Sequence, residues 1–177
     1  MSGKIVGIGL MLVAVITAAS LYYLQVYHFY EEPVEGGTVE LTAIATGLPE
    51  EIIADDVISI NATSSPIRYR ACFTTPMSQS LLTEAYVEAP GAAPLVAPDW
   101  FDCFDADEIG AALENGTALA FMGTENHEYG VDRLVAIFDD GRGFVWHQLN
   151  DCGRKQYDGT PTGPECPART TARETDN

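Results

Sequence analysis

Two arginines beside a cysteine are the first residues in this chain whose spacing suggests chemistry. The segment 64–76 reads SSPIRYRACFTTP and places Arg68 and Arg70 next to Cys72. The setting is unusual, because the chain has 26 acidic residues, nine basic ones and a formal net charge of −17. Guanidinium groups can bind an anion, pair with the chain's own carboxylates or mark a surface for a partner. These three roles stay open at this point.

The acidic segment 98–108 offers partners for these arginines. It reads PDWFDCFDADE and carries five carboxylates around Cys103. On an expected strand, Arg68 and Arg70 share a face with Cys72, so a disulfide to Cys103 would bring both arginines to the carboxylates. Pairing with the chain's own acidic loop is therefore the expected role, although exposed ion pairs contribute under about 1 kcal/mol each.

Aromatic side chains surround the cysteine of the same acidic segment. Trp100 and Phe101 precede it and another phenylalanine follows it, and a core position is the default for such rings. An exposed part of the cluster would instead suit a protein partner. We therefore hypothesise that Arg68, Arg70, Trp100 and Phe101 line a partner-facing surface.

Other candidate sites are less specific. The carboxylates of 98–108 lack the spacing and the central glycine of a calcium loop. His127 lies between Glu125 and Glu128, which leaves a small-ligand or metal site near it as an alternative. The chain has no nucleophile elbow, no phosphate-binding glycine loop and no Cys-x-x-Cys pair. We therefore expect a protein that is not an enzyme and that uses no cofactor.

The N-terminal segment predicts where these residues act. Residues 5–24 read IVGIGLMLVAVITAASLYYL without a charge, and a helix of about 20 residues spans the hydrocarbon core of a bilayer. Aromatic rings follow up to residue 30, as at a membrane–water boundary. Lys4 precedes the run and acidic residues follow it, which favours a cytoplasmic N-terminus. We expect residues 5–27 to anchor the chain, with a cleaved signal peptide ending near residues 18–20 as the alternative.

The same features limit the partners. Small residues recur four positions apart at Gly3 and Gly7 and at Ala14 and Ala18, a spacing that lets anchor helices associate into a homo-oligomer. The acidic remainder would repel phosphate-rich nucleic acid and anionic lipid headgroups. A protein partner in the membrane or envelope is therefore favoured, and nucleic acid is not.

All four cysteines follow the anchor, which fits an oxidising compartment. Sequence alone permits three pairings of Cys72, Cys103, Cys152 and Cys166. Proximity along the chain favours Cys72–Cys103 and Cys152–Cys166. The chain-entropy model assigns roughly 3 to 4 kcal/mol to each.

Alternating apolar residues predict the strands. Residues 39–45 and 67–73 alternate at period two, and 117–123 reads as a buried strand. Residues 131–149 predict a hairpin that turns at Asp140-Gly141.

Three segments predict short helices. One lies at the start of 49–62, and a second follows Thr75 as N-cap with Pro76 in the first turn. The third covers 105–116, capped by Asp105 with Glu108 three residues on. Strands with interspersed short helices indicate an α+β fold around a mainly antiparallel sheet.

Three stretches of the chain resemble an uncharacterised family of short, membrane-anchored proteins of alphaproteobacteria. They are SSPIRYRACFTTP, LVAPDWFDCFDA and DGRGFVWHQLN, and the resemblance extends from the anchor to about Cys166. It implies a bacterial inner-membrane protein with a cytoplasmic N-terminus and a periplasmic domain. The family has no established activity, so the resemblance implies no catalytic residue.

The expected organisation has four parts. Residues 1–30 form the membrane anchor, 31–37 a linker, 38–167 the periplasmic α+β domain and 168–177 a disordered tail. The expected function is that of an accessory or binding module for a membrane or envelope complex. The alternative is a periplasmic domain that binds a small ligand or a metal.

Overall fold

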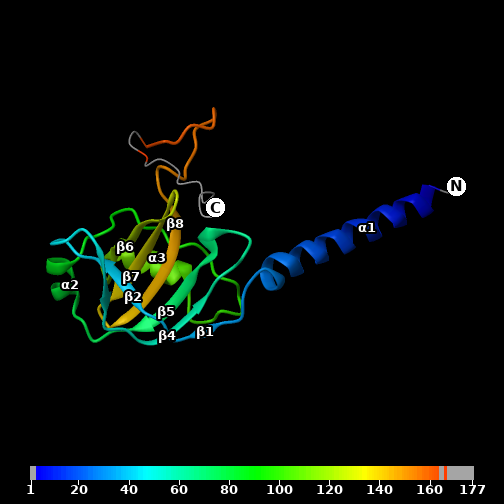
Figure 1. Ribbon diagram of the computed structural model, residues 1–177. Coiled ribbons are helices and arrows are strands. Elements are labelled where there is room, and N and C mark those ends of the chain that lie inside the picture. The colour runs from blue at the N-terminus through cyan, green and yellow to red at the C-terminus, as the bar shows by residue number, and fades with distance from the viewer. Residues whose placement is uncertain (1–2, 164–165, 167–177) are drawn as a thin grey trace, which may run out of the picture.

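A long N-terminal helix, α1 (Gly3–Tyr23), projects away from the rest of the chain (Figure 1). The computed structural model describes residues 3–163 and residue 166, so the predicted tail 168–177 lies outside the described residues. A π-helical turn, Leu24–His28, continues α1, and neither segment has a buried residue. Within the described part of the chain, Gly3–His28 is the one helix long and apolar enough to cross a membrane, with a mean hydropathy of 2.3. Its composition suggests membrane anchoring.

Six antiparallel strands form the main sheet, in the order β1-β4-β5-β8-β7-β6. A separate antiparallel pair, β2-β3, lies against β6. The predicted hairpin is confirmed as β7 and β8, and the Arg142 amide donates to the Asp140 carboxylate within its turn at 3.0 Å. The α+β class with a mainly antiparallel sheet is therefore confirmed. The strands are β1 (Val34–Glu35), β2 (Val39–Thr42), β3 (Pro49–Ile52), β4 (Asp55–Ile60), β5 (Arg70–Thr74), β6 (Ala118–Glu128), β7 (Val131–Phe138) and β8 (Arg142–Leu149).

Alternation along the strands buries both faces of the main sheet. One face, with Phe144 and Trp146, packs against α3 (Ala106–Asn115) and the loop before it. The other face packs against α2 (Gln79–Ala85) and the β2–β3 pair. Each large apolar side chain buried in this way contributes about 1.5 to 3 kcal/mol.

Two of the predicted helices exist, with differences at their ends. Asp105 caps α3, where its carboxylate accepts from the amides of Asp107 at 2.9 Å and Glu108 at 3.1 Å. The predicted cap at Thr75 is wrong, because α2 begins later with Ser78 as its N-cap. The Thr75 hydroxyl is buried and donates instead to the carbonyl of Ile53 at 2.7 Å.

The helix predicted at the start of 49–62 is wrong. This segment forms β3 and β4, and β3 pairs with β2 along its whole length. The acidic residues there favour a helix locally, but the strand pairing supplies hydrogen bonds that outweigh a weak intrinsic preference.

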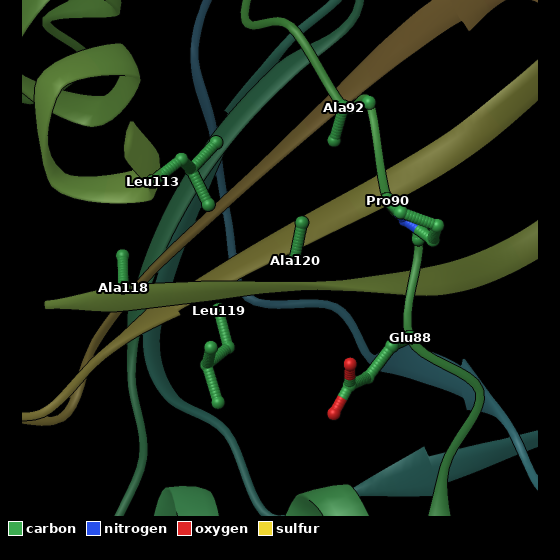
Figure 2. A pocket seen from close by; sticks show the side chains of 9 residues that line it. Glu88, Pro90, Ala92, Leu113, Ala118, Leu119 and Ala120 are labelled. Atoms are coloured by element: carbon green, nitrogen blue, oxygen red, sulfur yellow. The ribbon is translucent and has the colours of Figure 1, made fainter. Parts of the chain in front are cut away.

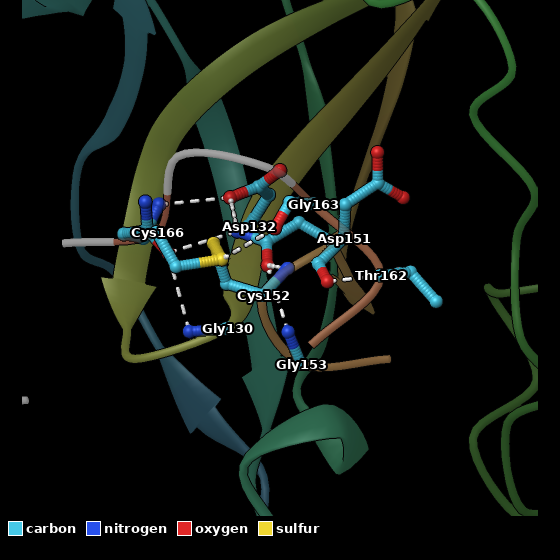
Figure 3. Close-up of a disulfide and its surroundings, with 10 residues drawn as sticks. Gly130, Asp132, Asp151, Cys152, Gly153, Thr162, Gly163 and Cys166 are labelled. Atoms are coloured by element: carbon cyan, nitrogen blue, oxygen red, sulfur yellow. Dashed lines mark hydrogen bonds between the residues drawn. A yellow bond between two sulfur atoms is a disulfide. The ribbon is translucent and has the colours of Figure 1, made fainter. Parts of the chain in front are cut away.

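Both predicted disulfides are confirmed. Cys72–Cys103 joins β5 to the loop before α3, and Cys152–Cys166 closes the C-terminal loop. Figure 3 shows the second disulfide beside Gly130 and Asp132, at the turn between β6 and β7. Two disulfides suggest an oxidising compartment.

Candidate functional site

The π-helical turn Leu24–His28, which continues α1, is held against the domain by two side chains from the predicted surface. The Trp100 indole donates to the carbonyl of Val26 at 2.8 Å, and Arg68 Nη1 donates to the carbonyl of Gln25 at 3.2 Å. The last carbonyls of a helix have no partner within the helix and carry its negative dipole end. An indole N–H and a guanidinium are therefore well matched to this position.

The backbone reinforces the same junction. Tyr30 forms a β-bridge with Ala62, and the Glu31 amide donates to the carbonyl of Asn61 at 2.9 Å. The Tyr30 ring lies edge-on to Trp100 at 5.6 Å between centroids, and the Arg68 guanidinium lies 5.6 Å from the Tyr30 centroid. Within the predicted linker 31–37, β1 pairs with β4, so this tether is part of the main sheet.

Arg70 is buried, with an exposed fraction of 3%, and its expected pairing with the 98–108 carboxylates is wrong. Burial lowers the pKa of its guanidinium to about 10, while the nearby Tyr30 acts in the opposite direction. Among the described residues, neither Arg68 nor Arg70 forms an ion pair with a carboxylate. Backbone carbonyls take that place for Arg70, namely those of Leu95 at 2.8 Å, Val96 at 3.2 Å, Ile67 at 2.8 Å and Tyr69 at 2.6 Å.

The four residues of the predicted partner surface therefore differ in accessibility. Arg68 and Trp100 are half-buried at the junction, whereas Arg70 and Phe101 lie in the interior. Arg70 and Phe101 can act on a partner only by positioning the residues around them. A partner-binding role for this set stays a prediction.

A groove of about 320 Å³ opens beside the junction. Its walls come from the π-helical turn Leu24–His28, the short 3₁₀ turn Pro66–Arg68 and the loop 95–98. Of its ten lining residues, two are arginines and none is Asp or Glu. Because no carboxylate lines it, the groove should repel a negatively charged group less than the rest of this acidic chain does.

A second cluster of polar side chains surrounds Arg133. It lies on the face of the main sheet opposite to the face that carries Arg70 and Trp146. Arg133 Nε donates to His147 Nε2 at 3.0 Å, and Arg133 Nη2 donates to His127 Nε2, also at 3.0 Å. His147 Nδ1 donates to the carbonyl of Pro66 at 2.6 Å, and its ring stacks on Tyr69 at 4.9 Å. Both imidazoles are therefore held in their neutral form.

Burial is the main cause of the low basicity of both rings. It lowers the pKa of His147 to about 4, and the positive charge of Arg133 acts in the same direction. Burial also lowers the pKa of His127, again with help from Arg133. The sequence did not predict this cluster, because a two-residue turn at Asp140-Gly141 would pair Arg133 with Gln148, whereas the observed register pairs Arg133 with His147.

Comparison with known proteins gives a family but no activity. Residues 39–167 match a family of unknown function, DUF6446. The chain belongs to this family. The expected membership of an uncharacterised family is thus confirmed, and the origin in alphaproteobacteria stays a prediction. No curated protein and no solved structure matches the chain.

The DUF6446 domain has a further cavity of about 180 Å³ between β6, the end of α3 and residues 88–92. Figure 2 shows Ala118 and Ala120 on the same side of β6 as Leu113, with Leu119 on the other side. The small side chains of Ala118 and Ala120 leave this space. Among the described residues, no group of three or more His, Cys, Asp or Glu is placed to hold a metal ion.

Proposed function

We propose that this protein is a non-enzymatic, single-pass protein of the bacterial inner membrane. Its N-terminus lies in the cytoplasm, and its disulfide-bonded domain lies in the periplasm. The domain acts as an accessory or binding module for a membrane or envelope complex. Lys4 before the apolar run and two disulfides after it support this orientation.

The observation that carries the proposal is the built junction between α1 and the domain. Trp100 and Arg68 hydrogen-bond to the last carbonyls of the helix, and Tyr30 joins the domain through a β-bridge. A domain on a loose tether would sample many orientations. A domain held in this way presents one fixed surface at the membrane, which suits lateral binding to another membrane or envelope protein.

Mild-detergent extraction of the tagged full-length protein, followed by mass spectrometry of co-purifying proteins, tests this proposal. We expect a discrete partner in a fixed ratio that survives a change of detergent. Arg68→Glu should weaken the association, and Arg154→Glu, on the C-terminal loop, serves as the matched control. A protein that purifies alone in every detergent would contradict the proposal. The intact mass of the purified chain separates a retained anchor from a cleaved signal peptide.

The alternative function, binding of a small ligand or a metal, draws support from the histidine cluster. The ring centroids of His127 and His147 lie 4.9 Å apart, and both rings are neutral. Arg133 occupies one nitrogen of each ring, so a metal ion would have to displace it. Elemental analysis of the purified protein and the change in melting temperature on addition of Zn²⁺ test this alternative.

A further inference from the structure

We propose that the groove beside Arg68 binds the phosphate of a membrane phospholipid and that the rest of the lipid lies along α1. This inference depends on the membrane anchoring in the proposed function. It adds a specific ligand class to the junction, which the accessory role does not require.

The groove lies at the level where a bilayer has its phosphates. Residues 5–24 have about the length of the hydrocarbon core, and they are followed by the amide side chain of Gln25, whose backbone carbonyl accepts from Arg68. About 20 helical residues cover the hydrocarbon core, so the position after this run falls in the headgroup layer. The exposed rings of Tyr22, Tyr23 and Tyr27 lie on the neighbouring helical turns, as aromatic belts do at this boundary.

Arg68 has hydrogen-bonding capacity left for a phosphate. Its guanidinium makes one hydrogen bond and no ion pair within the described residues, and it lies over the Tyr30 ring. A guanidinium has five N–H donors arranged as a planar fork that fits phosphate oxygens. Contact with an aromatic ring restricts the orientation of that fork and so reduces the entropy lost on binding.

The groove also has an apolar side. Val96 lines it and is 76% exposed, and the neighbouring Leu95 is 37% exposed. Arg70 fixes this loop by donating to the carbonyls of both residues, at 2.8 Å for Leu95 and 3.2 Å for Val96. A cation beside exposed aliphatic side chains is matched to an amphipathic ligand rather than to a small soluble anion.

The acidic character of the whole domain determines which lipid fits. A net charge of −17 repels lipids with net negative headgroups, but the phosphate of a zwitterionic lipid has its charge offset by its own amine. The local absence of carboxylates around Arg68 removes repulsion at short range. We therefore expect binding of a single zwitterionic phospholipid beside α1.

Native mass spectrometry of the full-length protein, reconstituted with phosphatidylethanolamine and released in mild detergent, tests the inference. We expect one phospholipid to remain bound to the wild type. In Arg68→Gln this occupancy should fall about tenfold or more, the ratio for loss of a charge-assisted hydrogen bond. Arg68→Lys should retain part of it, and Arg154→Gln should retain it fully.

A second variant covers the case in which Arg68→Gln alters the fold. Val96→Asp changes an exposed side chain and brings a negative charge to the groove, so the lipid should again be lost while the melting temperature stays unchanged. Equal lipid occupancy in the wild type and both variants would overturn the inference. So would displacement of the lipid by millimolar inorganic phosphate, which would identify the ligand as a free anion, or a bound peptide in place of the lipid. The count of bound lipid is independent of any co-purifying protein, so the accessory role can fail while this inference holds.

Discussion

The indole N–H of Trp100 donates to the backbone carbonyl of Val26, although 74 positions separate the two residues in the chain. This bond joins the end of the apolar helix to the loop that the Cys72–Cys103 disulfide ties to β5. The junction, the loop and the disulfide therefore form one connected unit. Motions of the domain relative to α1 must break contacts within this unit.

Trp100→Phe tests the junction directly. The ring still packs on Tyr30, but the hydrogen bond to Val26 is lost, which costs about 0.5 to 1.5 kcal/mol. We expect hydrogen exchange at the amides of Glu31 and Thr63, which bond across the junction, to accelerate about two- to tenfold. Mass spectrometry of the full-length protein in detergent measures this, with peptides from β7 as the internal control. Equal acceleration in β7 would show that the whole domain is destabilised instead.

The two arginines of the opening segment should differ strongly when they are replaced. Arg70→Lys removes the fork that satisfies buried carbonyls, and we expect a loss of about 3 kcal/mol or more in the free energy of unfolding. Arg68→Gln removes one half-exposed hydrogen bond and should cost about 1 kcal/mol. Urea unfolding of both variants in the same detergent gives the comparison. Similar losses would contradict the structural role assigned to Arg70.

The local pattern of the sequence predicted β2, β5, β6, the β7–β8 hairpin and both disulfides, and it singled out Arg68 and Trp100 of the junction. Period-two alternation correctly put Arg70 and Cys72 on one face of the sheet, with Ala71 on the other. Two of the four carbonyls that accept from Arg70, those of Leu95 and Val96, lie 25 and 26 residues away in the chain, so these partners were not predictable from the local sequence. Charged residues are seldom buried, so an exposed position was the natural expectation for Arg70.

Tertiary contacts also determine the elements for which the sequence predicted the wrong structure. The acidic start of 49–62 has helix-forming residues, and its pairing with β2 appears in no local pattern. The contact between Trp100 and α1 depends on the direction in which the helix leaves the domain. An anchor could be predicted from its composition, but its docking on the domain could not.

His147 should make the domain less stable in mild acid. Its folded pKa is about 4, against 6.5 for an ordinary histidine, because burial disfavours the charged ring. Unfolded chains therefore take up a proton below pH 6.5, while the folded domain does so only near pH 4. Above pH 6.5 the ring is neutral in both states and has no effect on the pH dependence of stability. As the pH falls from 6.5 towards 4, the free energy of unfolding decreases, and at about pH 5 it is lower by about 2 kcal/mol.

Urea unfolding of the wild type and His147→Gln between pH 7 and pH 4 measures this contribution. The variant has no ring to protonate, so its stability should depend less on pH across this range, whatever its stability at neutral pH. Arg133 and His127 contact the same ring and remain in both proteins. An identical pH dependence in both would show that other groups cause the acid sensitivity.

The two disulfides should contribute unequally to global stability. Cys72–Cys103 links β5 to the loop before α3 and closes a 31-residue separation, so replacing both cysteines by alanine should cost about 4 kcal/mol. Cys152–Cys166 closes a loop that follows β8, the last described strand, and that loop can open while the sheet stays folded. Removing the second bridge should change the urea midpoint of the sheet little. An equal shift for both bridges would mean that the C-terminal loop unfolds together with the sheet.

Replacing Gly143 and Gly110 by alanine should change the stability of the domain in opposite directions. Gly143 on β8 pairs with Phe73 on β5, and a Cβ at this position would overlap the Phe73 ring. Because that ring is buried and cannot move away freely, Gly143→Ala should cost about 1 to 3 kcal/mol.

Gly110 lies inside α3, where a Cβ would meet only Pro94 at 3.9 Å, an ordinary contact. Gly110→Ala should therefore stabilise the domain by up to about 1 kcal/mol, the difference in helix propensity. Thermal unfolding of the two variants side by side measures both signs, and a stabilising Gly143→Ala would mean that β5 and β8 pack less closely than the structure has them.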